Sequence, residues 1–310
     1  MRGKVAYSSQ RTRGEIMLYY GQTFKELRIA KGISLSTAAK NVVSKSFLSR
    51  FERNKTKIVF DKLYRLLLNI NVSVEEFVYI NNQRNGCHQP FHYEDTKDYV
   101  DQQGFENSNT LSKYYYQKWT KNHDEYDYVN FLKEKSIMEK HQFAKVSQNE
   151  KQFLYNYLFS KETWTHYEIR LYMSIISLFS PMQSFYLTQQ MLKNGSETID
   201  VNWNHQADFL YIILSTALIM AFQGNVPELA RLIKQAEQSI HNEQYLYEKT
   251  ELHFIKGLLI YLKGNRAVAK QTIKESIDVF KVLNSPKLVD LYSRRWQKFL
   301  NTQKNSSASN

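Results

Sequence analysis

The chain of 310 residues carries a net charge of +12, and its 42% hydrophobic and 14% aromatic content supports a large core, which excludes a globally disordered protein. Its 10 glycines and 4 prolines are too few for the frequent turns of an all-β fold, and its single cysteine, Cys87, excludes an internal disulfide and fits a reducing cytoplasm. Three quarters of the net charge lies in residues 1–80, which contain 15 Lys and Arg but only 6 Asp and Glu.

The sequence lacks the signals of a membrane or secreted protein. No apolar run approaches the roughly 20 residues that cross a bilayer, because the strongest one, Phe209 to Phe222, is interrupted by Ser215 and Thr216. The N-terminus has no apolar signal core. We therefore expect a soluble, cytoplasmic protein without a membrane partner.

Residues 1–16 are basic, with Arg2, Lys4, Arg11 and Arg13, and have little hydrophobic pattern. Two alternatives remain open for them. They form a flexible arm that reaches toward DNA, or translation begins at Met17 and they are not part of the protein.

Residues 17–80 have the pattern of five short helices, as in a compact helix-turn-helix (HTH) domain. The first helix closes at Gly32, the second begins at Ser34, and the third begins at Ser44, whose hydroxyl is a good N-cap. Two further helices run from Phe60 to Ile70 and from Ser73 onward. A concentration of positive charge within and before such a domain favours a surface that neutralises phosphates over a merely solvated face.

The third helix of this pattern is basic with one buried seam. Leu48 and Phe51 lie three residues apart and can both face the core. Asn54 can adopt the left-handed conformation that ends a helix. The remaining positions carry hydrogen-bond donors and positive charge: Lys45, Ser46, Ser49, Arg50 and Arg53.

The stretch from Leu27 to Val78 resembles an HTH of the lambda-repressor (XRE) type. Two segments, Gly21–Arg28 and Phe47–Arg53, are similar more narrowly to the Rgg/GadR/MutR regulators. The resemblance implies an ion pair between Arg28 and Glu52. It also implies double-stranded DNA as a partner and a set of DNA-binding residues: Ser44, Lys45, Ser46, Phe47, Ser49, Arg50, Lys55 and Lys57.

Within that set, the roles are expected to differ along the helix. Lys45, Ser46 and Arg50 match positions that meet base edges, and the N-terminal end of the helix enters the major groove. Ser44, Lys55 and Lys57 are better placed for phosphates. The alternative for Arg50 is a surface residue that reads no base.

Residues 81–92 are polar and contain Gly and Pro, so we interpret them as a linker. Cys87, His88 and His92 resemble metal ligands in type. A structural zinc site needs four ligands with recognisable spacing, and the sequence offers no second cluster. We expect neither a metal nor another cofactor.

Residues 93–300 have a helical pattern almost throughout. The segments Ile219–Asn225 and Leu259–Asn265 align at a spacing of forty, and each ends in Gly-Asn before another helix. Helix, Gly-Asn turn and helix at this period predict a tetratricopeptide-like repeat domain. Residues 301–310 are polar and are expected to form a disordered tail.

The second half also resembles the Rgg-type C-terminal helical domain, in Tyr155–Leu171 and Glu248–Phe299. The resemblance implies a homodimeric transcription regulator controlled by a short intracellular peptide pheromone, with RNA polymerase as a further candidate partner. We expect the dimer interface in the repeats, because the HTH domain has few spare apolar residues. Arg170 is a candidate for a peptide carboxylate, and the alternative is an ordinary surface arginine.

The sequence contains none of the common catalytic motifs, so we do not expect an enzyme. The competing hypothesis is a helical-repeat adaptor whose basic N-terminal domain contacts a protein or another anion. Sequence-specific binding to duplex DNA distinguishes a regulator from such an adaptor.

Overall fold

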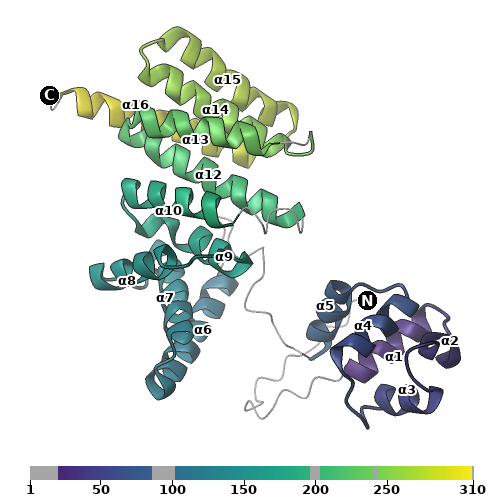
Figure 1. The fold of residues 1–310 in the computed structure, drawn as a ribbon. Helices are drawn as coiled ribbons and strands as arrows, with labels where there is room; N and C mark the ends of the chain where they lie inside the picture. The colour runs from purple at the N-terminus through teal and green to yellow at the C-terminus, as the bar shows by residue number, and fades with distance from the viewer. Residues whose placement is uncertain (1–19, 86–101, 196–202, 241–242, 309–310) are drawn as a thin grey trace. The chain divides into compact units, whose positions relative to one another are not determined.

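The computed structural model describes residues 20–85, 102–195, 203–240 and 243–308, and the chain divides into two compact units, residues 1–92 and 93–310. Every regular element in the described ranges is a helix (Figure 1). The predicted all-α fold is therefore confirmed. Residues 1–16, for which the sequence left two alternatives, lie outside the described residues.

Five helices form the first unit: α1 (Tyr20–Ala30), α2 (Leu35–Ala39), α3 (Lys45–Glu52), α4 (Phe60–Asn69) and α5 (Val74–Asn85). They enclose one core to which all five contribute: Phe24, Ala38, Ala39, Leu48, Phe51, Leu63, Leu66, Leu67, Ile70, Val72 and Phe77. The seam of Leu48 and Phe51 that the sequence predicts is thus buried, which directs the polar side of α3 outward.

Short polar residues define the ends of the HTH helices. The Ser34 and Ser44 hydroxyls accept hydrogen bonds from the amides of Thr37 and Phe47, at 3.1 and 3.2 Å. These bonds satisfy donors that a helix start otherwise leaves unpaired. Asn54 has φ 55° and ends α3 in the left-handed conformation, as the sequence predicts.

The predicted start of the linker at residue 81 is wrong. Helix α5 continues to Asn85, and Asn81 is fully buried, where its side-chain oxygen accepts a hydrogen bond from the Thr23 hydroxyl at 3.0 Å. Arg84 forms an ion pair with Glu26 of α1. These contacts with α1 hold a segment whose polar composition alone is typical of a loop. Residues 86–92 lie outside the described residues.

The second unit stacks helical hairpins, as Figure 1 shows. Its helices are α6 (Gln102–Asn122), α7 (Glu125–Lys140), α8 (Gln148–Phe159), α9 (His166–Ile175) with the 3-10 turn η2 (Ile176–Leu178), α10 (Pro181–Asn194), α12 (Trp203–Gln223), α13 (Val226–Ser239), α14 (Leu246–Leu262), α15 (Arg266–Val282) and α16 (Pro286–Ala308). Within the described residues, a single large apolar cluster joins α7 to α16.

The repeat at a spacing of forty is present in three dimensions. Gly224 and Gly264 both have positive φ, 72° and 93°, between the helices of the α12–α13 and α14–α15 hairpins. The hydrogen bonds correspond one by one, since the Asn225 amide donates to Met220 and the Asn265 amide donates to Ile260, forty residues later. The two hairpins therefore have the same turn, with a left-handed residue that is glycine in both and that glycine adopts without a steric cost.

Helix α12 is the central helix of this unit and packs against α9, α10, α13, α14 and α16. Its stretch Gln206–Gln223 is long and apolar enough to cross a membrane by length and composition alone, and 56% of it is buried inside the protein. It also contains Asp208 and Thr216, which are buried and contact neighbouring helices. These features are typical of a core helix.

The predicted disordered tail from residue 301 is wrong for most of its length, because α16 continues to Ala308. The Gln303 side chain donates to the carbonyl of Phe222 at the end of α12, at 3.4 Å. No proline or glycine interrupts residues 301–308. A polar composition without a helix breaker therefore continues the helix.

Candidate DNA interface and ligand site

Helix α3 is fixed against α1 by a very close backbone approach. A Cβ atom added to Gly21 would lie 1.8 Å from the carbonyl oxygen of Phe51, so only glycine permits this spacing. The rings of Phe24 and Phe51 pack next to this contact, with centroids 6.1 Å apart. The absence of a side chain at Gly21 therefore determines how closely α3 approaches α1.

A two-bond ion pair adds to this attachment. Arg28 Nε and Nη2 donate to the two carboxylate oxygens of Glu52 at 2.6 and 2.8 Å, and Nη1 donates to the carbonyl of Ile33 at 2.7 Å. Both side chains are buried, and the hydrogen bond with Glu52 raises the pKa of Arg28. The pair that the resemblance implies is present, and it connects α1, the following turn and the end of α3.

The predicted DNA-binding cations are free to meet a ligand. Lys45, Arg50, Lys55 and Lys57 are exposed, and within residues 20–85 the structure gives none of them a carboxylate partner. Ser46 is exposed and Ser49 is partly exposed on the same helix. The side of α3 opposite its buried seam therefore presents positive charge and hydrogen-bond donors. The phosphates that line a DNA groove attract such a surface.

Two members of the predicted set have other contacts. Phe47 is only partly exposed and packs against the HTH core, with Lys62 Nζ 5.8 Å from its ring centroid. The Ser44 hydroxyl accepts from the Phe47 amide and lies 3.0 Å from the Ser46 hydroxyl. Phe47 therefore contributes packing beneath this surface, and Ser44 contributes the cap that orients the amides at the start of α3.

Lys62 also belongs to this surface, although its sequence context does not predict it. It belongs to α4, yet the cation–π contact with Phe47 places its ammonium group beside α3. Sequence spacing carries no signal for a neighbour contributed by another helix. Arg53, by contrast, follows α3 directly, and its Nε donates to the carbonyl of Ser49 at 3.1 Å.

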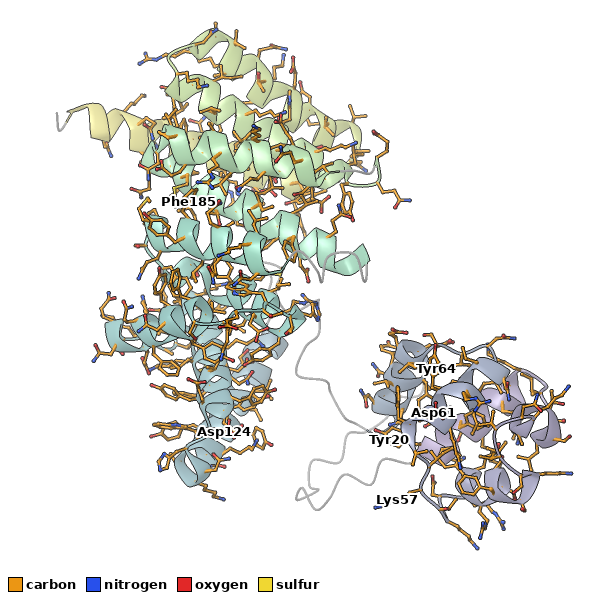
Figure 2. All side chains as sticks on the ribbon, in the orientation of Figure 1. Tyr20, Lys57, Asp61, Tyr64, Asp124 and Phe185 are labelled. Atoms are coloured by element: carbon orange, nitrogen blue, oxygen red, sulfur yellow. The ribbon has the colours of Figure 1, made fainter. Side chains whose placement is uncertain are left out.

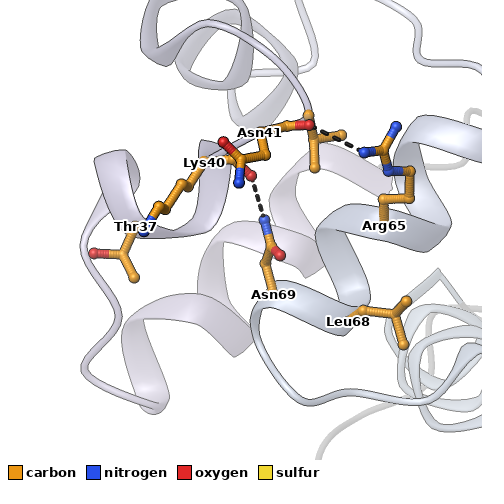
Figure 3. Close-up of a pocket in the computed structure, with 7 residues that line it drawn as sticks. Thr37, Lys40, Asn41, Arg65, Leu68 and Asn69 are labelled. Carbon is orange, nitrogen blue, oxygen red and sulfur yellow. Dashed lines mark hydrogen bonds between the residues drawn. The ribbon is translucent and has the colours of Figure 1, made fainter.

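A cavity of about 380 Å³ lies beside the turn between α2 and α3 (Figure 3). Helix α4 supports this turn, because Asn69 donates to the carbonyls of Ala38 and Lys40 at 2.8 and 2.9 Å, and Arg65 donates to that of Asn41 at 3.2 Å. The lining residues are Thr37, Lys40, Asn41, Val42, Arg65, Leu68 and Asn69. The cavity is distinct from the exposed side of α3.

Arg170 is buried, so the alternative of an ordinary surface arginine is wrong. It is only 7% exposed, and its Nε lies 3.3 Å from an oxygen of Asp208 in α12 and donates to His166 Nε2 at 3.1 Å. Asp208 is 1% exposed, and His166, at the start of α9, is partly exposed beside it. The site is a buried ion pair with one histidine at its edge.

The described residues contain no group of three or more His, Cys, Asp or Glu that could hold a metal ion. Cys87, His88 and His92 lie outside the described residues. The exposed cations on α3 and the buried pair of Arg170 and Asp208 are therefore the two candidate sites that the structure supports, one in each unit.

Solved structures share this fold over nearly the whole chain. Rgg2 of Streptococcus dysgalactiae, described as an SHP pheromone receptor, is 24% identical with a TM-score of 0.75, and the match covers 90% of this chain and 99% of that one. A candidate transcriptional regulator from Listeria monocytogenes EGD-e is 19% identical, with a TM-score of 0.75 and coverage of 92% and 98%. A complex of PrgX with cCF10 is 14% identical, with a TM-score of 0.65 and coverage of 92% and 94%.

Two family profiles match the two units separately. A profile described as "Helix-turn-helix" matches residues 24–77, and one described as "HTH-type transcriptional regulator Rgg, C-terminal domain" matches residues 108–294. The second match covers more than half of the chain and includes both Gly-Asn hairpins. Together with the exposed cations on α3, these matches show that the chain belongs to the Rgg family of HTH-type transcriptional regulators.

Proposed function

We propose that this protein is a homodimeric, cytoplasmic transcription regulator that reads DNA with α3 and responds to a short peptide through its helical repeats, without a catalytic role. The observation that carries the proposal is the exposed cationic side of α3, held in place by the Arg28–Glu52 pair within a chain of the Rgg family. Residues 20–85 bind DNA, and residues 102–308 dimerise and bind the peptide.

The start of α3 enters the major groove in this proposal. Arg50 makes two hydrogen bonds to a guanine, while Lys45 and Ser46 contact the neighbouring base edges. The free amides that follow Ser44 face a phosphate, because the N-terminal end of a helix is positive. Lys55 and Lys57 contact the backbone on one side, and Lys62 joins them from α4.

The ligand of the repeat domain is a peptide by analogy with structural neighbours, which are described as a pheromone receptor and a complex of a peptide pheromone with its receptor. A peptide carboxylate would replace Asp208 as the partner of Arg170, and His166 at the edge would assist because its side chain is partly exposed. By thermodynamic linkage, the peptide can shift the equilibrium between two conformational states of the protein only as far as its affinities for the two states differ. RNA polymerase is the partner that a promoter-bound regulator would meet.

Selection from a random pool of DNA duplexes tests the DNA-binding half of the proposal. The full chain should enrich one sequence, and Arg50→Ala should relax the preference at one base pair of that sequence. The matched control is Arg294→Ala, because Arg294 is an exposed arginine of α16 that pairs only locally, with Asp290. If the wild-type chain enriches no sequence while it binds all duplexes weakly, the proposal is wrong and a repeat adaptor with a basic domain explains the chain better.

A further inference from the structure

The end of the repeat domain carries a second concentration of positive charge, separate from that of the HTH domain. Residues 252–310 contain 11 Lys and Arg but only 3 Asp and Glu, whereas residues 81–251 contain 16 and 21. The positive charge of the repeat domain is therefore gathered at one end of its stack of helices. Figure 1 shows α15 and α16 at the end opposite α6 and α7, and Figure 2 shows the side chains that project outward from them.

Four of these cations form a stripe that begins in the turn before α15 and continues along the helix. Arg266, Lys270 and Lys274 follow one another at a spacing of four residues, so they share one side of α15 and lie about 6 Å apart along its axis. Lys263, three residues before Arg266, extends the row. All four side chains are exposed, and within the described residues none of them forms an ion pair. This α15 stripe can therefore meet an anion.

The matching hairpin shows that the fold does not require these cations. The α12–α13 and α14–α15 hairpins share one turn, in which the amides of Val226 and Arg266 donate to the carbonyls of Gly224 and Gly264 at 2.9 and 3.0 Å. Three positions of the stripe are neutral forty residues earlier, where Lys263, Arg266 and Lys270 correspond to Gln223, Val226 and Ala230. The same backbone is thus built without most of the charge.

The start of α15 is also an unfavourable place for positive charge. The N-terminal end of a helix is positive, so acidic residues are stabilising there. Helix α13 has Glu228 in its first turn, whereas α15 has no acidic residue in its first turn and begins with Arg266. Like charges four residues apart destabilise a helix as well. The stripe therefore lowers the stability of the free protein, which favours a role in binding an anion.

Packed aromatic rings lie beside the first cations of the stripe. The Arg266 guanidinium lies 5.7 Å from the ring centroid of Tyr261, and the Tyr261 ring is 5.5 Å from that of Phe299 in α16. The Phe299 ring in turn lies 5.7 Å from Phe222, and Lys298 Nζ is 5.9 Å from the Phe222 centroid. These rings connect the stripe to Lys298, a further exposed cation. The basic surface therefore continues from α15 onto α16 around one rigid ring cluster.

We infer that the α15 stripe binds the phosphate backbone of duplex DNA, as a second contact beside the reading of bases by α3. A row of exposed cations matches a row of phosphates and reads no sequence. A membrane surface would also require exposed apolar side chains, and from residue 263 to residue 274 the only large one is Val268. A second copy of the same stripe would be repelled by its charge.

The proposed function favours DNA over an acidic protein as the partner, and the inference rests on it to that extent. A chain that is already bound to DNA through its HTH domain presents the repeat domain to phosphates at a high effective concentration, so even a weak second contact adds affinity. The expected contribution of the stripe is sequence-independent affinity. The choice of operator stays with α3.

Lysine acetylation of the full chain tests the contact without any substitution. Mass spectrometry compares the acetylation rate of each lysine with and without a long duplex of random sequence. We expect at least threefold protection of Lys263 and Lys270. Exposed lysines in the acidic part of the repeat domain should not be protected, and they serve as controls: Lys113, Lys145 and Lys193.

Lys57 of the HTH domain, labelled in Figure 2, reports the proposed function in the same experiment. Protection of Lys57 without protection of Lys263 and Lys270 would overturn the inference and leave the proposed function standing. If Lys57 is not protected either, both are wrong.

A variant built from the matching hairpin tests the same contact through affinity. Lys263→Gln, Arg266→Val and Lys270→Ala together introduce the residues of α12–α13, so the turn should be retained, and an unchanged unfolding temperature checks this. The affinity should fall about tenfold for the selected and the random duplex alike, and the salt slope should decrease by about 3. The matched control removes the same charge elsewhere, with Lys113→Gln, Lys145→Gln and Lys193→Gln.

A decrease no larger than that of the control would overturn the inference and leave the stripe to an acidic protein. The preference for the selected duplex, which Arg50→Ala relaxes, is measured in the same titrations. It tests the proposed function independently, because removing a backbone contact leaves the ratio of the two affinities unchanged.

Discussion

Arg28 and Glu52 connect the first and third helices of the HTH domain by two hydrogen bonds, at 2.6 and 2.8 Å, in a place where both are buried. Because the pair is shielded from solvent, Arg28→Met leaves a buried carboxylate unpaired and should destabilise the domain by about 3–5 kcal/mol. The control is Arg294→Met, since the pair of Arg294 with Asp290 is exposed and is worth less than about 1 kcal/mol.

Hydrogen exchange of the α1 and α3 amides is the suitable measurement for this prediction. The four tryptophans, Trp119, Trp164, Trp203 and Trp296, all lie after residue 100, so fluorescence reports on the repeat domain only. Equal protection of α3 in Arg28→Met and wild type would show that the pair contributes nothing.

Arg50→Ala should weaken binding to the selected duplex by about 1–3 kcal/mol and relax the preference at one base pair, because a guanine loses two hydrogen bonds. Lys57→Ala should instead weaken all duplexes alike and reduce the salt slope by about 1. Titrations over a range of salt concentrations separate the two results. If Arg50→Ala lowers specific and non-specific binding by the same factor, Arg50 does not read a base.

Glu150 should give the repeat domain an acid-sensitive stability. Burial alone would raise the pKa of this carboxylate, but hydrogen bonds from Lys135 and from Ser147 outweigh burial and lower the pKa below its ordinary value of 4.5. A lowered pKa in the folded state means that the stabilisation is complete above pH 4.5 and is lost as the pH falls further.

Glu150→Gln should therefore cost about 1–2 kcal/mol at neutral pH, because Lys135 loses its charged partner and the bond from the Ser147 amide to this side chain is no longer charge-assisted. The difference from wild type should shrink below pH 4.5. Urea unfolding followed by tryptophan fluorescence measures it, with the exposed Glu162→Gln as the control. A difference that is constant with pH would contradict the assignment.

Substitutions of Arg170 and of Asp208 should change the affinity for an acidic peptide in opposite directions. Asp208→Asn removes the internal competitor and should strengthen binding of a peptide with a free carboxylate, whereas Arg170→Gln should weaken it. A ligand that binds only the folded state raises the unfolding temperature, so a thermal scan followed by tryptophan fluorescence reports the effect.

The same peptide with its carboxylates amidated is the control for this pair. Both substitutions break a buried ion pair and should lower stability without peptide. If the two variants lose peptide-dependent stabilisation equally, the pair is structural and Arg170 does not contact the ligand.

Local chemistry made much of the fold predictable. Ser44, Asn54, Gly224 and Gly264 each act through a cap or a turn conformation that depends on neighbours in sequence, and the structure places each one as expected. The errors at residues 81 and 301 share a different cause. Asn81 and Gln303 are polar, but each finds a hydrogen-bond partner that is distant in sequence, Thr23 and Phe222.

The candidate site divides in the same way. The exposed cations of α3 follow from helical periodicity around Leu48 and Phe51, so sequence alone indicates which side faces outward. Lys62 and Asp208 were not predictable, because each acts beside a residue of another helix, Phe47 and Arg170 respectively. Neither pairing has a signature in the spacing of the chain.

A Cβ atom at position 21 would lie 1.8 Å from the Phe51 carbonyl oxygen, and this close approach has a consequence for inference between homologues. A regulator with any side chain at the equivalent position must hold its third helix farther from its first, even if every base-contacting residue is identical. Its helix would then enter the groove at a different depth and angle. The assignment of base-contacting residues to operator bases can therefore be carried over only between proteins that both have glycine at this position. The residue that decides this is one that does not itself contact DNA.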